Sequence, residues 1–309
     1  MKLVRLKTLF FLPFVLFPSL STADATRDRD VVALLPAQFV EDTGAANRIE
    51  AGDILRTVSQ EVAAAVCHFH NGVAPDLSEK LLNEGIGKFD VMLDALLNGN
   101  ENLGIVGGEE RRKTIALLEQ VGASWQPTRD AALGVIAEPT DTSAVNVVYG
   151  SATTLLDQTY LLLSELEGEY ANPVELLQAD VMLLEVSGRQ SMLTQRLSYL
   201  ACRAWSGTAD ANYKETLATT LSQFDFAMGA LRNGMPEMGI MPPPTDEIAD
   251  LLERAAADWT VIEGHIATMN DADIADTETA DALYRMLADK MYTMEEVAHQ
   301  YALYSKRVY

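Results

Sequence analysis

The sequence contains few of the residues that build disulfide frameworks or metal sites. It has two cysteines and four histidines in 309 residues. Two cysteines form one disulfide at most within a chain, which excludes the multi-bridge framework of a small secreted domain. His68 and His70 lie two positions apart and therefore point to different faces of a helix, while His265 and His299 are isolated. No histidine pair is spaced to chelate a metal.

Motifs for catalysis are missing from the sequence as well. The chain has no glycine-rich phosphate loop, no nucleophile elbow and no paired-cysteine metal motif. Its many carboxylates form no distinctive pair and are typical of solvated helix faces. We therefore expect a protein that is not an enzyme and that needs no cofactor.

Positive charge is scarce: 23 Lys and Arg stand against 45 Asp and Glu, for a net charge of -22 at pH 7. A surface this acidic repels the phosphate backbone of nucleic acids and the headgroups of anionic lipids. After the N-terminal region, charges at helical spacing interrupt every apolar stretch. We expect no nucleic-acid partner and no membrane span in the mature chain.

The N-terminus has the pattern of a secretion signal. Basic residues in the first seven positions precede an apolar run of about a dozen residues, and Ala23-Asp24-Ala25 follows as a small-x-small cleavage pattern. The alternative, a membrane anchor, needs an apolar run of roughly 20 residues. We expect a signal peptide at 1–25, a flexible segment at 26–46, and export to the periplasm.

From about Arg48 onward, the chain carries one sequence pattern twice, with matching residues about 135 positions apart. An internal repeat of this kind predicts two copies of one structural unit. The matched pairs include Phe89-Asp90 with Phe224-Asp225, Asn98-Gly99 with Asn233-Gly234, Gly104-Ile105 with Gly239-Ile240, Cys67 with Cys202, and, one position out of step, Trp125 with Trp259.

Both copies have the apolar period of helices. In the first copy, apolar residues recur from Leu82 to Leu96 at steps of four and three, and the second copy repeats the stripe at 217–231. Short connections between consecutive helices favour antiparallel neighbours. We therefore predict an all-α protein of two tandem up-down four-helix bundles, at 47–171 and 172–309. The predicted helices span 47–71, 77–98, 109–136 and 143–169, then 174–206, 210–233, 246–269 and 277–306.

Residues that start or stop helices agree with these bounds. Gly72 and Gly207 follow the opening helix of each copy, where a left-handed residue ends a helix well. Asn172-Pro173 is typical of an N-cap followed by a first-turn proline and marks the boundary between the copies. Pro127 lies inside the third predicted helix and should kink that helix or end it there, and we expect a bend.

The opening helix of the second copy contains the run S-G-R-Q-S-M-L-T-Q-R-L at 187–197. This run resembles the A-G-R-Q-R-M-L-S-Q-R motif of the type IV pilus methyl-accepting chemotaxis transducer N-terminal family. That PilJ-type domain is related to the sensor domain of NarX-type nitrate receptors. The matching run at 51–60 in the first copy is degenerate. The resemblance covers nearly the whole mature chain as two copies, and it implies a helical sensor domain of chemotaxis or signal transduction that binds a small ligand.

In the nitrate receptors, an arginine of this run holds the oxyanion between the first helices of two subunits. The corresponding position, four residues before the shared glutamine, is Arg56 in the first copy and Ser191 in the second. At another matched position, Arg196 stands where the first copy has Glu61. The resemblance therefore implies an anion site that is weakened, because only one copy keeps the arginine.

A line of small and polar residues runs beside the apolar stripe of each opening helix. Small residues let two helices approach closely. We infer that the two lines face each other across an internal pseudo-two-fold axis, so that one chain imitates a receptor dimer; the alternative is a line that merely borders core and surface. The lines are Gly52, Arg56, Gln60, Ala63 and Cys67, and Gly188, Ser191, Gln195, Ser198 and Cys202.

The two cysteines test this inference. If the lines face each other, Cys67 and Cys202 can form a disulfide that stabilises the fold by about 4 kcal/mol in the chain-entropy model. The alternative is two separate buried thiols, which behave as small apolar residues.

A ligand site at this seam would use Arg56 as a two-pronged donor, because an arginine fork suits an oxyanion such as nitrate. The alternative is an arginine paired with a nearby carboxylate, either Glu61 or Asp53. The predicted ligand-binding residues are Arg56, Gln60, Ser191, Gln195 and Arg196.

Met235, Met238 and Met241 form a separate pattern in the loop before three consecutive prolines. Thioethers are soft ligands that suit Cu(I) in an exported protein, but methionine is also an ordinary flexible filler under loops.

We predict an exported sensor-type protein that binds a small oxyanion or docks on a membrane receptor or another protein. The alternatives are a helical interaction protein with a vestigial ligand site, and a periplasmic copper-binding protein.

Overall fold

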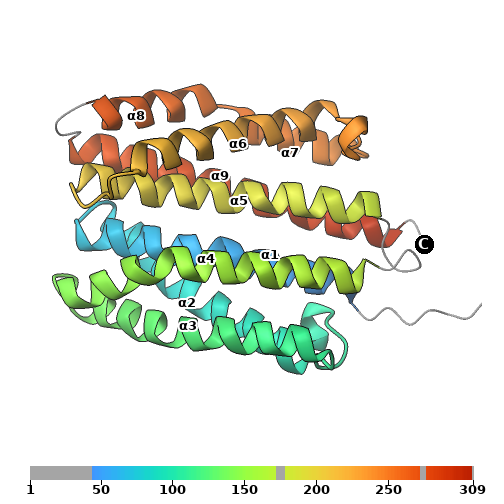
Figure 1. The fold of residues 1–309 in the computed structure, drawn as a ribbon. Coiled ribbons are helices and arrows are strands. Elements are labelled where there is room, and N and C mark those ends of the chain that lie inside the picture. Colours follow the sequence, from blue (N-terminus) through green and yellow to red (C-terminus); the bar gives the residue numbers. More distant parts are fainter. Residues whose placement is uncertain (1–43, 172–177, 272–275, 308–309) are drawn as a thin grey trace, which may run out of the picture. The chain divides into compact units, whose positions relative to one another are not determined.

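The computed structural model describes residues 44–171, 178–271 and 276–307 (Figure 1). This part of the chain is all-helical, as predicted, with nine α-helices, two 3₁₀ turns and no strand. The signal peptide, most of the predicted flexible segment and the Asn172-Pro173 boundary lie outside it. The α-helices are α1 (Ala45–His70), α2 (Pro75–Asn98), α3 (Arg112–Ala137), α4 (Thr142–Tyr170), α5 (Gln178–Trp205), α6 (Tyr213–Asn233), α7 (Asp246–Ala256), α8 (Trp259–Asp271) and α9 (Thr277–Arg307).

One predicted helix is wrong, because the segment 246–269 forms two helices. The chain breaks between α7 and α8, where Ala257 is extended and Asp258 has a left-handed φ of 59°. Conversely, α3 does not end at Pro127 and continues to Ala137. One residue after the proline, Thr128 Oγ1 lies 2.9 Å from the Ser124 carbonyl oxygen of the preceding turn and 2.8 Å from Ser151 Oγ of α4.

Two long helices, α1 and α5, lie side by side in the middle of the helical unit (Figure 1). Helix α1 also packs against α2, α4 and α9, and α5 packs against α6, α8 and α9. Helix α3 covers α4, while α7 contacts α9. Residues from all these helices share one apolar core, so α1 and α5 are the most enclosed elements. None of the described helices combines the length and the apolarity that crossing a bilayer requires.

The turns that follow α1 and α5 use the glycines expected there. Gly72 has φ 68° and Gly207 has φ 71°, which is the left-handed conformation predicted at both helix ends. Side-chain caps begin two other helices: Asp141 accepts from the backbone N–H of Ser143, and Thr245 accepts from that of Ile248.

Aromatic residues of the two sequence copies make the same contacts. Phe89 stacks on Trp125 with ring centroids 4.0 Å apart, and Phe224 stacks on Trp259 at 3.8 Å. Each indole N–H also donates to the aspartate that follows the phenylalanine, at 2.7 Å in the first pair and 2.6 Å in the second. The loops after α2 and α6 likewise each contain one isolated bridge, Asn100 with Ile105 and Met235 with Ile240.

Candidate functional site at the seam of α1 and α5

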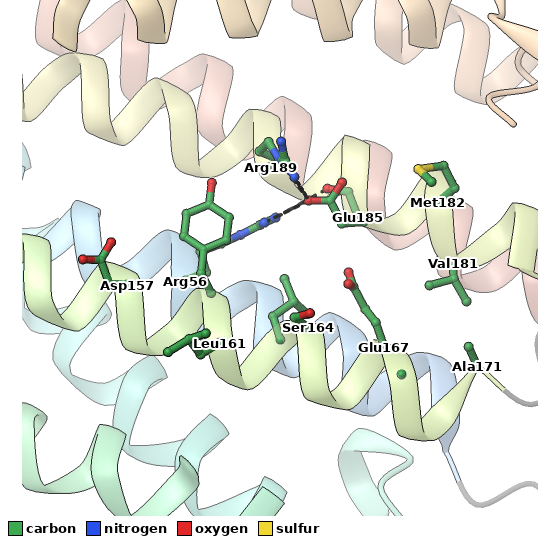
Figure 2. A pocket seen from close by; sticks show the side chains of 13 residues that line it. Arg56, Asp157, Leu161, Ser164, Glu167, Ala171, Val181, Met182, Glu185 and Arg189 are labelled. Carbon is green, nitrogen blue, oxygen red and sulfur yellow. Dashed lines mark hydrogen bonds and ion pairs between the residues drawn. The ribbon is translucent and has the colours of Figure 1, made fainter. Parts of the chain in front are cut away.

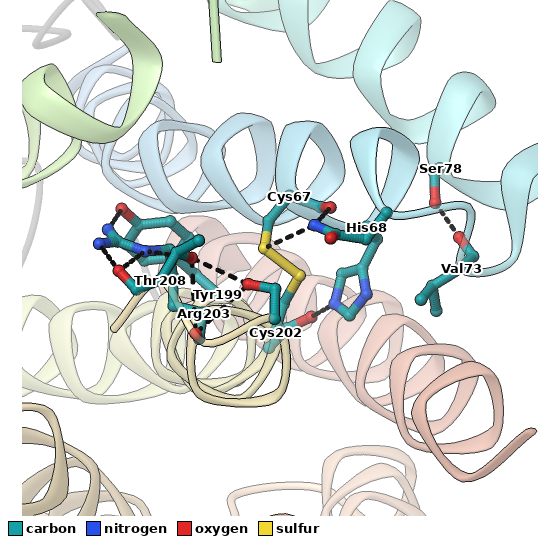
Figure 3. Close-up of a disulfide and its surroundings, with 11 residues drawn as sticks. Cys67, His68, Val73, Ser78, Tyr199, Cys202, Arg203 and Thr208 are labelled. Atoms are coloured by element: carbon teal, nitrogen blue, oxygen red, sulfur yellow. Dashed lines mark hydrogen bonds between the residues drawn. A yellow bond between two sulfur atoms is a disulfide. The ribbon is translucent and has the colours of Figure 1, made fainter. Parts of the chain in front are cut away.

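The seam between α1 and α5 is polar although it is buried. Arg56, Gln60, Ser191 and Gln195 are each at most 2% exposed. Toward the C-terminal ends of α1 and α5, Cys67 and Cys202 form a disulfide with a Cα–Cα distance of 6.2 Å (Figure 3). Beside it, His68 Nε2 lies 3.1 Å from Ser198 Oγ, and its ring stacks on Tyr284. The two predicted lines therefore meet at Cys67 and Cys202, whereas Gly52 lies against Leu163 and Leu166 of α4.

Arg56 lies at the floor of a cavity of about 900 Å³ between α1, α4 and α5 (Figure 2). Its side chain is completely buried. One guanidinium nitrogen contacts Asp53 on the same helix, and another donates to Glu185 Oε1 of α5 at 3.2 Å. The ring of Tyr160 lies 4.9 Å from the guanidinium carbon. Among the described residues, Nε has no hydrogen-bond partner.

A second guanidinium, that of Arg189, contacts the same carboxylate oxygen as Arg56 (Figure 2). Arg189 Nε donates to Glu185 Oε1 at 2.9 Å, and Tyr160 lies 6.0 Å from its guanidinium carbon. Glu185 therefore sits between two arginines. A carboxylate is itself a planar oxyanion, so its position shows where these donors converge.

Gly188 allows Asp53 to come this close to the seam. A Cβ built on Gly188 would overlap the Asp53 carboxylate, so any larger residue in α5 would push it away. Burial raises the pKa of Asp53 to about 6, although the charge of Arg56 opposes the rise. The glycine of the family-like run thus has a local structural role beside the candidate site.

Glu167 of α4 lines the same cavity and is partly neutral at physiological pH. Burial, followed by the neighbouring charge of Glu185, raises its pKa to about 7. Its Oε1 atom is buried and has no hydrogen-bond partner in the described part of the chain. A protonated Glu167 adds no negative charge to the cavity and can donate a hydrogen bond.

The five predicted ligand-binding residues do not line one cavity. Arg56 faces the cavity just described, Ser191 faces a second one, and Gln60 shares a third with Arg196. The Gln60 side-chain amide donates a hydrogen bond to the carbonyl of Ala152 at 3.2 Å. Within the described residues, the Ser191 hydroxyl and the Gln195 amide have no hydrogen-bond partners. Of the five, only Arg56 lines the cavity of about 900 Å³.

One of the two carboxylates suggested as a partner of Arg56 is wrong. Asp53 pairs with Arg56, whereas Glu61 is buried elsewhere, with both oxygens unpartnered in the described structure. The sequence alone did not identify Glu185, Tyr160 or Glu167. A usable signal was the spacing of Glu185 and Arg189, which are four residues apart on one helix and therefore share a face.

The histidines and methionines singled out in the sequence lie in different surroundings. His70 Nδ1 lies 2.6 Å from the carbonyl of Pro139, away from His68. Met238 and Met241 are each about half exposed, at 51% and 50%, while Met235 packs against the core. A search of the described residues finds no group of three His, Cys, Asp or Glu arranged for a metal ion.

Comparison with known proteins gives a family match for part of the chain. A search of curated proteins finds no match. Residues 177–292 match the family model PilJ, described as "Type IV pili methyl-accepting chemotaxis transducer N-term". The match begins before α5, includes Glu185 and Arg189, and reaches into α9. This match supports the resemblance to the PilJ-type family that the sequence of the second copy indicated, and it does not extend over the first copy.

Proposed function

We propose that this protein is an exported sensor module that binds a small oxyanion in the cavity at Arg56. The observation that carries the proposal is a fully buried guanidinium at the floor of an accessible cavity, with a second guanidinium beside it. Forked donors of this kind match the geometry of planar oxyanions such as nitrate. The match of residues 177–292 to a sensor family agrees with a ligand-binding role.

In this proposal, Glu185 is a carboxylate that the ligand displaces. It occupies the position between Arg56 and Arg189 that an incoming oxyanion needs. Its side chain is 15% exposed, so it can turn toward solvent, whereas the buried Asp53 remains beside Arg56. Displacement costs affinity because three charge-assisted hydrogen bonds to Glu185 must be replaced. We therefore expect binding to be weaker than at a site without this carboxylate.

The seam supports a wider proposal about architecture. We infer that α1–α4 and α5–α9 are two tandem copies of one bundle, and that α1 and α5 act as the first helices of two receptor subunits. Support comes from the paired Phe-Trp-Asp contacts and from the contact between the two opening helices. Export is supported by the signal-like N-terminus and by a disulfide, since disulfides persist in oxidising compartments.

An anion panel tests the proposal by thermal shift. Nitrate, nitrite, sulfate, phosphate and acetate are compared on the parent protein, on Arg56→Lys and on Glu185→Gln. A ligand at a hundredfold over its Kd should stabilise the parent by about 2.7 kcal/mol. Arg56→Lys keeps the charge but loses the fork, so its affinity should fall at least about tenfold. Glu185→Gln removes the competing charge and should bind more tightly.

Arg232→Lys is the matched control for this panel. Arg232 also makes a two-pronged pair, with Glu253 at 2.9 and 2.6 Å, but it lies outside the cavity. This variant should respond to anions like the parent. If no anion shifts the parent, or if Arg56→Lys responds identically, the anion site is wrong. The interaction protein with a vestigial site would then be favoured, because Arg56 is already paired with two carboxylates.

Nitrate affinity should also rise as the pH falls from 8 to 6. Glu167 takes up a proton through its pKa of about 7, which removes a negative charge from the cavity. The expected gain is up to about tenfold, equivalent to about 1.4 kcal/mol. Asp53, with a pKa of about 6, extends the trend at the lower end. Calorimetric titration with nitrate at each pH measures this change in affinity. Nitrate itself keeps its charge between pH 8 and pH 6.

The variant Glu167→Gln isolates the contribution of that one carboxyl group. It lacks the titrating group, so its nitrate affinity should change much less between pH 8 and pH 7 than that of the parent. A parent whose affinity is the same at pH 8 and pH 6 would show that Glu167 does not face the bound anion.

A further inference from the structure

A second cavity, of about 460 Å³, opens on the seam and is lined by α1, α2, α5 and α9. Its charge is mainly negative. Lys88 Nζ pairs with Glu295 at 3.4 Å, and His299 Nδ1 lies 2.9 Å from Glu50. The carboxylates of this cavity are Glu50, Asp53, Glu295 and Glu296. They outnumber the basic side chains that line it, so the cavity favours a cation.

Two buried hydroxyl groups line the same cavity without a partner. Ser191 is 2% exposed and Thr57 is 1% exposed. Neither Ser191 Oγ nor Thr57 Oγ1 has a hydrogen-bond partner among the described residues. An unsatisfied buried hydroxyl costs about 1–3 kcal/mol. A ligand that donates hydrogen bonds to these two hydroxyls would remove that cost. The unpaired hydroxyls therefore point to a ligand independently of the acidic side chains.

The position of this cavity corresponds to that of the Arg56 cavity in the repeated sequence. At an offset of 135, Ser191 takes the place of Arg56, and Glu295 takes the place of Tyr160. A guanidinium and an aromatic ring are thus replaced by a hydroxyl and a carboxylate. This exchange puts an anionic group where the first cavity has none. Helix α9 takes the place of α4, and α2 lines only the second cavity.

We propose that this second cavity binds a small primary ammonium ligand. The ammonium group donates to Glu295, Ser191 and Thr57, and a short alkyl chain lies against Ile54 and Met92, which also line the cavity. Three donors on one cationic nitrogen match three acceptors of this kind. A metal ion fits less well, because the described residues contain no group of three His, Cys, Asp or Glu arranged to hold one. The two cavities share Asp53, which pairs with Arg56, but the proposal does not require nitrate to bind at the Arg56 cavity.

Calorimetric titration with n-butylammonium chloride tests the proposal, with 1-butanol as the uncharged analogue of the same chain length. The parent should bind n-butylammonium and not 1-butanol. Glu295→Gln and Ser191→Ala should each lower the affinity, the first by at least about tenfold because a charged partner is lost. If Glu295→Gln does not fold, Glu50→Gln replaces it as the acidic variant.

Two control variants keep this test separate from the anion site. Arg56→Lys should retain n-butylammonium binding even if nitrate binding is lost or never present. Glu278→Gln removes an exposed carboxylate of α9 outside the cavity and should behave like the parent. The proposal is overturned if the parent does not bind n-butylammonium, if 1-butanol binds equally well, or if both cavity variants keep the parent's affinity.

Discussion

Removing the Cys67–Cys202 disulfide is expected to lower the free energy of unfolding by about 4–5 kcal/mol. The bond joins residues separated by 135 positions, so it restricts a long loop in the unfolded chain. Both cysteines are 0% exposed, and buried thiols are tolerated in a core. The loss should therefore come mostly from the unfolded state and leave the seam intact. Urea denaturation of the oxidised parent and of Cys67→Ala/Cys202→Ala measures the difference.

Reductant supplies the control for the disulfide. It should destabilise the parent by a similar amount and leave the double variant unchanged. The contrary result would be a parent that incorporates two alkylating labels without reductant, as judged by intact mass. That outcome would mean that α1 and α5 are not linked, and the facing arrangement of the two lines would lose its covalent support.

The variant Glu61→Gln should be more stable than the parent at high pH. Burial raises the pKa of Glu61 to about 8, with Glu295 and Glu84 adding to the rise and Lys88 opposing it. The folded state keeps a proton that the unfolded state releases near pH 4.5, so the parent loses stability as the pH rises from about 4.5 to about 8. At pH 9 the variant should gain on the order of 3 kcal/mol.

The pH at which the gain appears distinguishes this mechanism from a general packing effect. At pH 4.5 both side chains are uncharged and similar in shape, so parent and variant should unfold at nearly the same denaturant concentration. Glu119→Gln, which changes an exposed carboxylate of α3, should show no such gain at pH 9. A gain for Glu61→Gln that is equal at both pH values would show that the buried charge is not its cause.

Most of the fold was predictable because local patterns determine it. The apolar period from Leu82 to Leu96 specifies one helix face, and Gly72 and Gly207 specify where two helices end. The break between α7 and α8 has no comparable signal. It depends on Asp258 adopting a left-handed conformation, and no glycine or proline next to Asp258 in the sequence indicates a break there. Pro127 lies inside α3, which continues to Ala137 and packs along α4, so a proline in the sequence did not mark a helix end here.

The candidate site was less predictable because its contacts join distant parts of the chain. Arg56 could be singled out from the resemblance, but its partner Glu185 lies 129 positions away on another helix. Glu61 belongs to an acidic sequence whose carboxylates suggested solvated helix faces. It is buried because α2 and α9 both pack against α1, and helical period alone does not predict that arrangement.

The most direct test of the central claim is a crystal structure of the protein with bound nitrate. The proposal predicts nitrate between Arg56 and Arg189, with the Glu185 carboxylate turned out of the position that it occupies in the free protein (Figure 2). Asp53 should stay beside Arg56, held against Gly188. A structure at saturating nitrate in which Glu185 keeps both arginines and the cavity holds no anion would contradict the proposal.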